Sequence, residues 1–512
     1  MNQTDALQFS RMTATVESLG DAAPDRHRFG DKAVLLIGEQ EVLATANGRQ
    51  CFLDCLRLLM RMVRRLTVSL PSASALSDEV ASIIKTCSYG CAPTVQNLSD
   101  VEFGKFDAIL SVGITGRADL PWTVINSNGW AIRLSSRGRS LPSDCSRQNP
   151  VGALGVACLG VAEVFKRLIR LKPERGQLHD LLVFSFYSYW TEDGPGPDLP
   201  NSLPVDLLLV GAGAIGNGTI HLLSSLPAQG RVIIVDKQTY GVENWGTCIL
   251  VGPQDLGVPK AIAAEKWLQG KIGAKGIHEA IESFKGRCGK EYDYPKLIIN
   301  GLDDRSARRA VQDFWPDQII DGAIGATSCE VTLHPWGPDL SCLKCDFGDP
   351  PTSAEWIQKE ATGLGPERLA DVFSVIGDDD IRAAPPEKQE RLRQRKGQQI
   401  CSVISEAVLE FLAGRSQGDG FQPSVPFVAC LSSCMIVSEL VRYVQKMPQV
   451  LETGFQFDVM VGPQNGQHMS HARKRDCICV TRSSNIEQLR VRRFDSDVNH
   501  NSSTGAGISE PL

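Results

Sequence analysis

The chain has 512 residues and a formal net charge of −6, from 53 basic and 59 acidic side chains. At roughly 100–200 residues per domain, this length predicts about two to four domains. The acidic balance argues against nucleic-acid binding through bulk charge, and 42% hydrophobic residues indicate a globular chain. We find no apolar run of the ~18–20 residues that span a bilayer, and residues 1–21 lack the apolar core of a signal peptide. We therefore expect a cytoplasmic protein that contacts neither membranes nor nucleic acid.

Two similar series of strands follow one another along the chain, and each ends in a long helix of small residues. Because strands alternate with helices, the pattern predicts an α/β fold with parallel sheets covered by helices on both faces. Two copies of one Rossmann-like unit predict an intramolecular pseudo-dimer. The expected strands are 32–37, 66–70, 106–112, 122–126 and 130–136 in the first copy and 205–210, 232–235, 295–300, 318–321 and 328–334 in the second, with closing helices from Asn149 and Val425.

The two copies predict the domain boundaries. We expect a first domain over 1–190, a Pro/Gly-rich linker over 191–204, a second domain over 205–492 and a disordered tail over 493–512. The second copy carries an insert at about 338–420 that the first copy lacks. Within this insert, the charged segment 381–399 is interpreted as a helix that begins at a proline or as a mobile crossover.

A glycine-rich loop marks the second copy as the one that binds a nucleotide. Gly211, Gly213 and Gly216 follow an expected strand and open an expected helix, whose N–H groups can hold phosphate. Asp236 ends the next strand, where a carboxylate can bind ribose hydroxyls. The alternatives are a tight turn without ligand and a dinucleotide site, since the loop alone does not distinguish NAD from ATP. In the first copy, Glu39 follows the strand, and its charge would repel phosphate.

The residues after Asp236 favour ATP. The chain has Asn244, Lys260, the pair Asp303-Asp304 and Arg308 in that order. This series resembles the adenylating domains of ubiquitin-activating enzymes and of the bacterial ThiF/MoeB sulfur-carrier activators. The resemblance implies a ThiF-type fold in which Asp236 binds the ribose, Asn244 and Lys260 bind phosphates, Asp303 binds Mg²⁺, and Asp304 and Arg308 complete the nucleotide site. A lysine and Mg²⁺ can offset the charge that develops on the α-phosphate.

One position departs from the family pattern. The arginine of the family's Asn-x-x-Arg segment is replaced by Thr247, so another residue must supply its charge or activity is reduced. In the family a second arginine enters from the partner domain, ahead of its first strand. Arg11 occupies the matching position here and is a candidate catalytic residue. The alternative for Arg11 is a solvated surface side chain.

Sixteen cysteines in a chain without a signal peptide indicate thiols or a metal site rather than disulfides. Cys342 and Cys345 form a C-x-x-C pair that suits half of a tetrahedral zinc site. By resemblance the other half lies near the C-terminus, where Cys477 and Cys479 form a C-x-C pair. The alternatives are thiols without metal or a site completed by His468 or His471.

By the same resemblance, Cys401 is the candidate thioester nucleophile, since it lies between the first cysteine pair and the closing helix. A helix start and nearby basic residues favour its thiolate. The alternative is a buried cysteine at a helix start.

The whole chain resembles most the activating enzymes of bacterial ubiquitin-like conjugation operons, the Bil-type antiphage systems. The resemblance implies adenylation of a ubiquitin-like protein with ATP and Mg²⁺, thioester formation on Cys401 and transfer to a conjugating enzyme in antiviral defence, with Zn²⁺ as a structural ion. No C-terminal ubiquitin-fold domain is expected. Three alternatives remain: a sulfur-carrier activator, a dinucleotide oxidoreductase and a non-catalytic scaffold.

Overall fold

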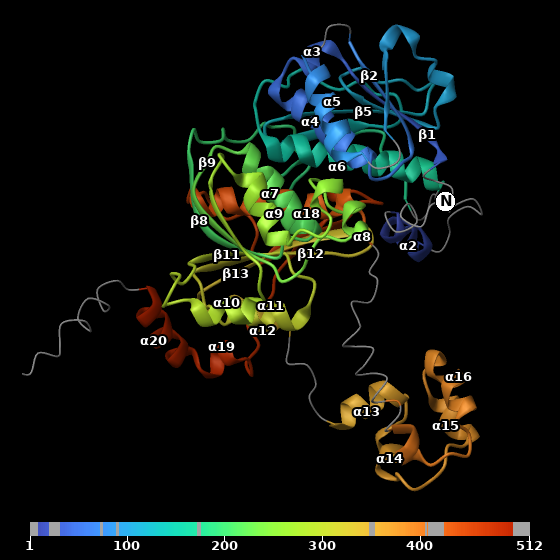
Figure 1. The fold of residues 1–512 in the computed structure, drawn as a ribbon, viewed down its shortest axis with the longest axis vertical. Helices are drawn as coiled ribbons and strands as arrows, with labels where there is room; N and C mark the ends of the chain where they lie inside the picture. The colour runs from blue at the N-terminus through green and yellow to red at the C-terminus, as the bar shows by residue number, and fades with distance from the viewer. Residues whose placement is uncertain are drawn as a thin grey trace, which may run out of the picture. The chain divides into compact units, whose positions relative to one another are not determined.

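The computed structural model describes residues 9–19, 31–71, 75–88, 92–170, 176–347, 354–404, 407 and 424–494. The chain forms two compact units (Figure 1). The larger unit comprises Met1–Phe347 and Pro423–Leu512, and the smaller one comprises Gly348–Gln422. Of the predicted tail over 493–512, residues 495–512 lie outside the described residues.

The first sheet of the larger unit has the strand order β3-β2-β1-β4-β5-β6-β7. Strands β3 to β5 in this order are parallel, and β6 and β7 are antiparallel to their neighbours. The strands are β1 (Ala33–Gly38), β2 (Arg65–Leu70), β3 (Thr94–Asn97), β4 (Ala108–Val112), β5 (Trp122–Asn128), β6 (Ala131–Ser135) and β7 (Leu182–Ser185).

The second sheet repeats this order as β10-β9-β8-β11-β12-β13-β14 and adds β15 at one edge. Its first five strands are also parallel and the others antiparallel. The strands are β8 (Leu203–Val210), β9 (Ala228–Val235), β10 (Gly273–Ile277), β11 (Leu297–Asn300), β12 (Gln318–Ile324), β13 (Ser328–Pro335), β14 (Gly454–Asp458) and β15 (Gln467–Met469). The shared order confirms the α/β prediction of two Rossmann-like halves.

Helices cover both sheets. The first half contains α2 (Ser10–Ser18), α3 (Gln40–Leu43), α4 (Ala46–Leu59), α5 (Ser77–Cys87) and α6 (Pro150–Ile169), with short 3-10 turns η2 (Leu98–Asp100) and η3 (Phe103–Lys105). The second half contains α7 (Ala214–Ser225), α8 (Val242–Trp245), η4 (Pro253–Asp255), α9 (Lys260–Leu268), α10 (Ile281–Arg287), α11 (Arg305–Gln312), α12 (Leu343–Asp346), α18 (Pro426–Val444), η5 (Pro463–Asn465), α19 (Ile478–Thr481) and α20 (Ser483–Phe494).

The two halves share one hydrophobic core. Helices α6 and α18 pack against each other, and the rings of Phe165 and Phe427 lie 5.6 Å apart between centroids. A buried polar contact also joins the halves, since His221 Nε2 lies 2.7 Å from Asp54 Oδ1. Continuous burial on this scale makes the halves one packed body, because apolar surface is removed from water on both sides. The arrangement of the two halves as a pseudo-dimer stays a prediction.

Helix α18 corrects one sequence expectation. It has 19 residues and a mean hydropathy of 1.6, so it is long and apolar enough to cross a membrane by composition alone. Its apolar window is 89% buried inside the protein, as expected of a core helix. The helix was predicted from Val425, but small polar residues interrupt its apolar run in the sequence. These residues are buried here: Ser433 Oγ donates to the Ile215 carbonyl at 2.7 Å.

The segment 191–204 is packed rather than loose. The backbone N–H of Trp130 donates to the Pro195 carbonyl at 2.9 Å, and its indole N–H donates to the Pro197 carbonyl at 2.8 Å. Strand β8 already begins at Leu203. The connection between the halves is therefore held along the surface of the first half.

The smaller unit contains α13 (Ala354–Thr362), α14 (Pro366–Ala370), α15 (Asp378–Ala383) and α16 (Pro386–Gln394). It has its own apolar cluster, which includes Leu364, Ile376, Leu392 and Ile400. The charged segment predicted over 381–399 contains α16, with Pro386 in its first turn as Pro favours.

Candidate nucleotide site and cysteine cluster

The glycine loop connects β8 to α7, the geometry that phosphate binding requires. Gly211 has φ +88°, a conformation that side chains disfavour, and a Cβ on Gly216 would lie 2.0 Å from the Gly211 carbonyl oxygen. Gly213 caps α7, and a Cβ on Gly213 would meet no heavy atom within 4 Å. The loop is therefore compact on its inner side and open at Gly213, where a ligand can approach the backbone.

Asp236 ties the end of β9 to this loop. Its Oδ2 accepts a hydrogen bond from the Ala212 N–H at 2.8 Å, and its Oδ1 accepts from the Gln238 N–H at 2.7 Å. The residue is 8% exposed. Because each carboxylate oxygen has a second lone pair, Asp236 can still accept from ribose hydroxyls.

Lys260 begins α9 and is only 5% exposed. Its Nζ donates to Gln238 Oε1 at 2.7 Å and lies 5.7 Å from the centroid of the Tyr240 ring. Tyr240 in turn donates from its hydroxyl to the Ala212 carbonyl at 2.6 Å, which places the ammonium beside the glycine loop. Among the described residues, no carboxylate forms an ion pair with Lys260, so its partners are neutral. A buried cation of this kind is suited to an anionic ligand.

The paired aspartates have separate roles. Asp304 caps α11, where its Oδ1 accepts from the Ala307 N–H at 2.7 Å. Asp303 is exposed and adjoins the glycine-loop end of the sheet through Gly301, whose N–H donates to the Val210 carbonyl at 2.9 Å. Asp303 is therefore the carboxylate of the pair that remains open to a metal ion.

Arg308 is buried, and each of its three nitrogens donates within the fold. Nε bonds the Leu302 carbonyl at 2.6 Å, Nη1 bonds Asp321 Oδ2 at 2.6 Å, and Nη2 bonds the Gly322 carbonyl at 2.9 Å. Burial raises the pKa of Asp321, and the charge of Arg308 opposes that rise. Arg308 therefore holds the loop that carries Asp303 rather than facing a ligand.

Asn244 lies in α8, and its Oδ1 accepts from the Gly241 N–H at 2.9 Å. Three residues on, Thr247 is buried and its hydroxyl donates to the Asn244 carbonyl at 3.2 Å. The position that an arginine occupies in the family pattern is thus filled by a short side chain that closes a local turn.

Arg11 lies in α2 and its charge reaches the nucleotide half. Burial raises the pKa of the neighbouring Cys248 thiol to about 11, and the positive charges of Lys260, Arg61 and Arg11 oppose this rise. Arg11 and Lys260 therefore act on the same thiol, directly after Thr247. Helix α2 thus carries a cation whose charge acts on this segment, and the catalytic role of Arg11 stays a prediction.

At the matching end of the first sheet, the carboxylate of Glu39 binds two backbone amides. Its Oε2 accepts from the Ile114 N–H at 3.0 Å and its Oε1 accepts from the Thr115 N–H at 2.8 Å. These amides follow β4, as Leu302 and Asp303 follow β11. An internal carboxylate thus occupies the end of the sheet where a phosphate-binding fold keeps its ligand.

Sequence reasoning missed three residues of the site: Asn217, Gln238 and Tyr240. Asn217 is fully buried and its Nδ2 donates to the Tyr240 hydroxyl at 3.3 Å. The position of Asn217, directly after Gly216, was the available signal. Gln238 and Tyr240 carry no such pattern in the sequence.

The four predicted zinc ligands come together. Their sulfurs all lie within 4.8 Å of one another, with Sγ–Sγ distances of 3.8 Å for Cys342–Cys345, 3.7 Å for Cys342–Cys477 and 3.5 Å for Cys345–Cys479. Zn–S bonds of about 2.3 Å in a tetrahedron place sulfurs about 3.8 Å apart. Their hydrogen bond lowers the pKa of Cys345 and raises that of Cys342, and burial raises that of Cys479, so a bound cation is required to hold all four as thiolates. The donor set fits Zn²⁺.

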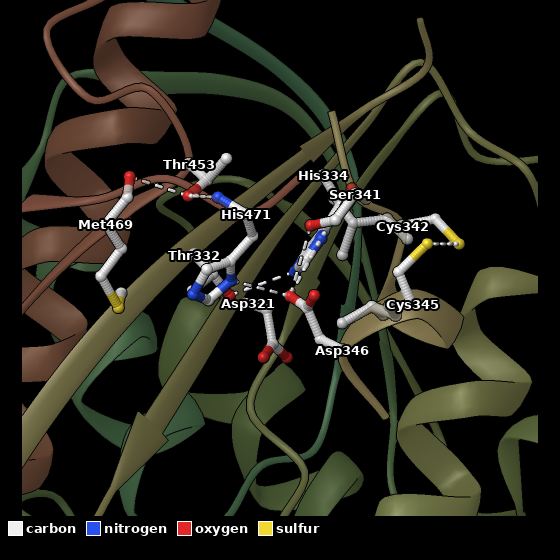
Figure 2. Close-up of polar contacts among 12 residues, drawn as sticks. Asp321, Thr332, His334, Ser341, Cys342, Cys345, Asp346, Thr453, Met469 and His471 are labelled. Atoms are coloured by element: carbon white, nitrogen blue, oxygen red, sulfur yellow. Dashed lines mark hydrogen bonds and ion pairs between the residues drawn. The ribbon is translucent and has the colours of Figure 1, made fainter. Parts of the chain in front are cut away.

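The cluster is anchored to the second sheet through Asp346, the residue after Cys345 (Figure 2). Asp346 Oδ2 lies 3.2 Å from His471 Nδ1, and His334 Nδ1 is 3.1 Å from the Ser341 carbonyl. His468 instead stacks on Trp190, with 5.0 Å between ring centroids. The two histidines considered as alternative ligands therefore have other contacts.

Removing zinc is expected to unfold the cluster locally, because four converging sulfurs lose the ion that offsets their charge. We expect about one zinc per chain by mass spectrometry of the metal content, and a lower melting temperature after treatment with a chelator. Cys479→Ser should lose the bound zinc. Cys288→Ala, which alters a buried cysteine in another apolar cluster, should keep it; loss of zinc in both variants would contradict the assignment.

Cys401 lies in the smaller unit and is half-buried. Its N–H donates to the Val372 carbonyl at 2.9 Å, and its Sγ lies 3.8 Å from Gln399 Oε1. Two basic residues expected to favour its thiolate have ion pairs of their own, Lys396 with Asp378 and Arg393 with Glu390. Cys401 is thus partly accessible, and these two cations are each engaged with a carboxylate.

Comparisons with known proteins bear on the second half. Residues 203–334 match the family model of the BilD C-terminal domain, a stretch that runs from β8 to β13. An uncharacterized protein, y4jF of Sinorhizobium fredii, is 26% identical over 475 residues, which cover 88% of this chain and 89% of that protein. The crystal structure of Escherichia coli MccB with MccA-N7isoASN is 11% identical and covers 72% of this chain and 99% of its own, with a TM-score of 0.36. A TM-score of this size does not establish a shared fold.

Proposed function

We propose that the chain is an ATP-dependent activating enzyme that adenylates the C-terminal carboxylate of a ubiquitin-like protein. The observation that carries this proposal is the buried ammonium of Lys260, which has neutral partners and lies beside an open glycine loop. The match of residues 203–334 to the BilD C-terminal domain supports it, together with the resemblance to Bil-type activating enzymes.

In the first step, a carboxylate oxygen of the ubiquitin-like protein attacks the α-phosphorus of ATP. The bond from that phosphorus to the bridging oxygen breaks, and pyrophosphate leaves with the electron pair. The loop amides and the α7 N-terminus hold phosphate, and Asp236 holds the ribose. Lys260 offsets charge on the α-phosphate, and Asp303 would hold a Mg²⁺ ion, which would supply positive charge for the phosphates. Arg11 supplies the further cation that Thr247 does not.

In the second step, the Cys401 thiolate attacks the carbonyl carbon of the acyl-adenylate and AMP leaves, which gives a thioester. A cysteine of a conjugating enzyme then displaces Cys401. The location of Cys401 in a separate compact unit supports this role, because a nucleophile outside the adenylation fold can serve two different reaction partners. By resemblance to the Bil-type operons, the pathway belongs to antiviral defence.

Two other functions use the same nucleotide site. A sulfur-carrier activator would share every adenylation residue but would deliver a thiocarboxylate, with a sulfurtransferase as its partner. A non-catalytic scaffold is favoured by Thr247, which lacks the charge of the family arginine. The smaller unit with its accessible cysteine favours conjugation over both.

Equilibrium binding separates the nucleotide classes. We expect titration calorimetry to show one MgATP site per chain, because Glu39 already binds the amides at the matching end of the first sheet. We expect NADH to bind far more weakly. Binding of NADH without MgATP would restore the oxidoreductase alternative. No binding of either nucleotide would favour the scaffold.

A further inference from the structure

Arg61 of the first half is almost completely buried although it carries a charge. It follows the end of α4 and is 1% exposed. Burial lowers the pKa of its guanidinium from the ordinary value. A guanidinium removed from water in this way persists only when its donors are satisfied.

The partners of Arg61 lie in the nucleotide half. Its Nε donates to the Cys248 carbonyl at 2.6 Å and its Nη2 donates to the Val251 carbonyl at 2.9 Å, while Nη1 bonds the Arg57 carbonyl at 2.6 Å. One planar side chain thus holds both ends of the segment 248–251, directly after Thr247. A second contact reinforces this one, since the indole N–H of Trp245 donates to the Cys87 carbonyl of the first half at 3.3 Å.

From this segment, hydrogen bonds lead to the glycine loop. The Leu250 N–H donates to Asn217 Oδ1 at 2.8 Å, and Asn217 Nδ2 donates to the Tyr240 hydroxyl at 3.3 Å. The Tyr240 hydroxyl donates to the Ala212 carbonyl at 2.6 Å, and the Ala212 N–H donates to Asp236. The first link is part-buried and the other three are buried, where a polar contact is costly to break.

We propose that Arg61 is a positioning residue through which the first half sets the geometry of the glycine loop in the second. This role rests on the proposed function in that the ligand of the loop is taken to be ATP. Arg61 does not contact the ligand, because its three nitrogens are occupied by carbonyls. It fixes the segment 248–251, and Asn217 and Tyr240 transmit that position to Ala212. The degenerate half is therefore a structural part of the nucleotide site.

The first test uses Arg61→Gln and Arg61→Lys in the full chain, with MgATP as the probe. We expect Arg61→Gln to raise the dissociation constant for MgATP about tenfold and Arg61→Lys to restore it to within about threefold, since lysine keeps the charge and one carbonyl bond. Exchange of the Leu250 amide hydrogen should accelerate by about tenfold in Arg61→Gln. Arg49→Gln in α4, which removes a half-exposed ion pair with Glu79, should change neither quantity.

The second test asks whether Arg61 acts through Tyr240. Tyr240→Phe removes the hydroxyl and keeps the ring under Lys260, so it should also weaken MgATP binding about tenfold. The double variant should bind no more weakly than either single variant, because both break one chain of contacts. Multiplied effects, to about a hundredfold, would overturn the inference. Tyr240→Phe also decides the matter if Arg61→Gln fails to fold.

Different experimental results would contradict the proposed function and the positioning role of Arg61. Absence of MgATP binding by the unsubstituted chain would overturn the proposed function. Unchanged Leu250 exchange in Arg61→Gln would overturn the positioning role alone, whatever the ligand of the loop is.

Discussion

Lys260→Met is expected to abolish measurable adenylation while the protein stays folded. Methionine keeps the aliphatic stem against Tyr240 and removes the charge. Loss of one group that stabilises developing charge costs about 2.7–4 kcal/mol, or roughly 10²–10³ in rate. A buried cation with neutral partners is itself costly to fold, so the melting temperature should stay unchanged or rise. The measurement is exchange of labelled pyrophosphate into ATP in the presence of the ubiquitin-like protein.

The matched control is Lys266→Met, which changes an exposed lysine of the same helix α9. It should leave exchange unchanged. If Lys260→Met retained more than about a tenth of the exchange rate, Lys260 would not be the cation at the α-phosphate, and Arg11 would be the next residue to replace.

Cys401→Ala is expected to retain pyrophosphate exchange and to lose the covalent adduct. The residues assigned to adenylation lie in the larger unit, whereas Cys401 lies in the smaller one, so the two steps should separate cleanly. Cys401→Ser should give an ester in place of the thioester, and this adduct resists thiols because an alkoxide is a poorer leaving group than a thiolate. Electrophoresis with and without reducing agent detects the loss of the adduct in Cys401→Ala and the thiol-resistant adduct in Cys401→Ser.

Cys288→Ser is the control for other thiols, because burial raises the pKa of Cys288 to about 11 and its thiol is unreactive at neutral pH. It should form the same thiol-sensitive adduct as the unsubstituted chain. Persistence of that adduct in Cys401→Ala would assign the nucleophile to another cysteine and leave the sulfur-carrier alternative open.

Much of the fold was predictable, because the buried parallel strands are continuous apolar runs. Strands β1, β8, β4 and β11 were located within about two or three residues, an error typical of element ends. Five strands were not predicted: β3, β7, β10, β14 and β15. Four of them, β3, β7, β10 and β15, lie at sheet edges, and β15 has only three residues. Edge strands lack the apolar pattern that marks a central strand.

The residues of the candidate site were predictable where they belong to a sequence motif. The spacing of glycines, Asp236, Lys260 and Asp303 along one half is visible in the sequence. The capping role of Asp304 and the internal bonds of Arg308 are not visible there, because the sequence does not distinguish a side chain that binds a ligand from one that bonds within the fold. Arg61 was not predictable at all, since its partners lie 187 and 190 residues away in sequence.

Glu39 has a thermodynamic consequence. Its carboxylate satisfies the amides of Ile114 and Thr115 permanently, so the first sheet is complete in the absence of any ligand. If the second half binds a nucleotide as proposed, it gains the equivalent anion only in the bound state, and the free energy of binding adds to the stability of the larger unit. We therefore expect MgATP to raise the melting temperature of the larger unit through the second half, while the first half needs no ligand to satisfy these amides.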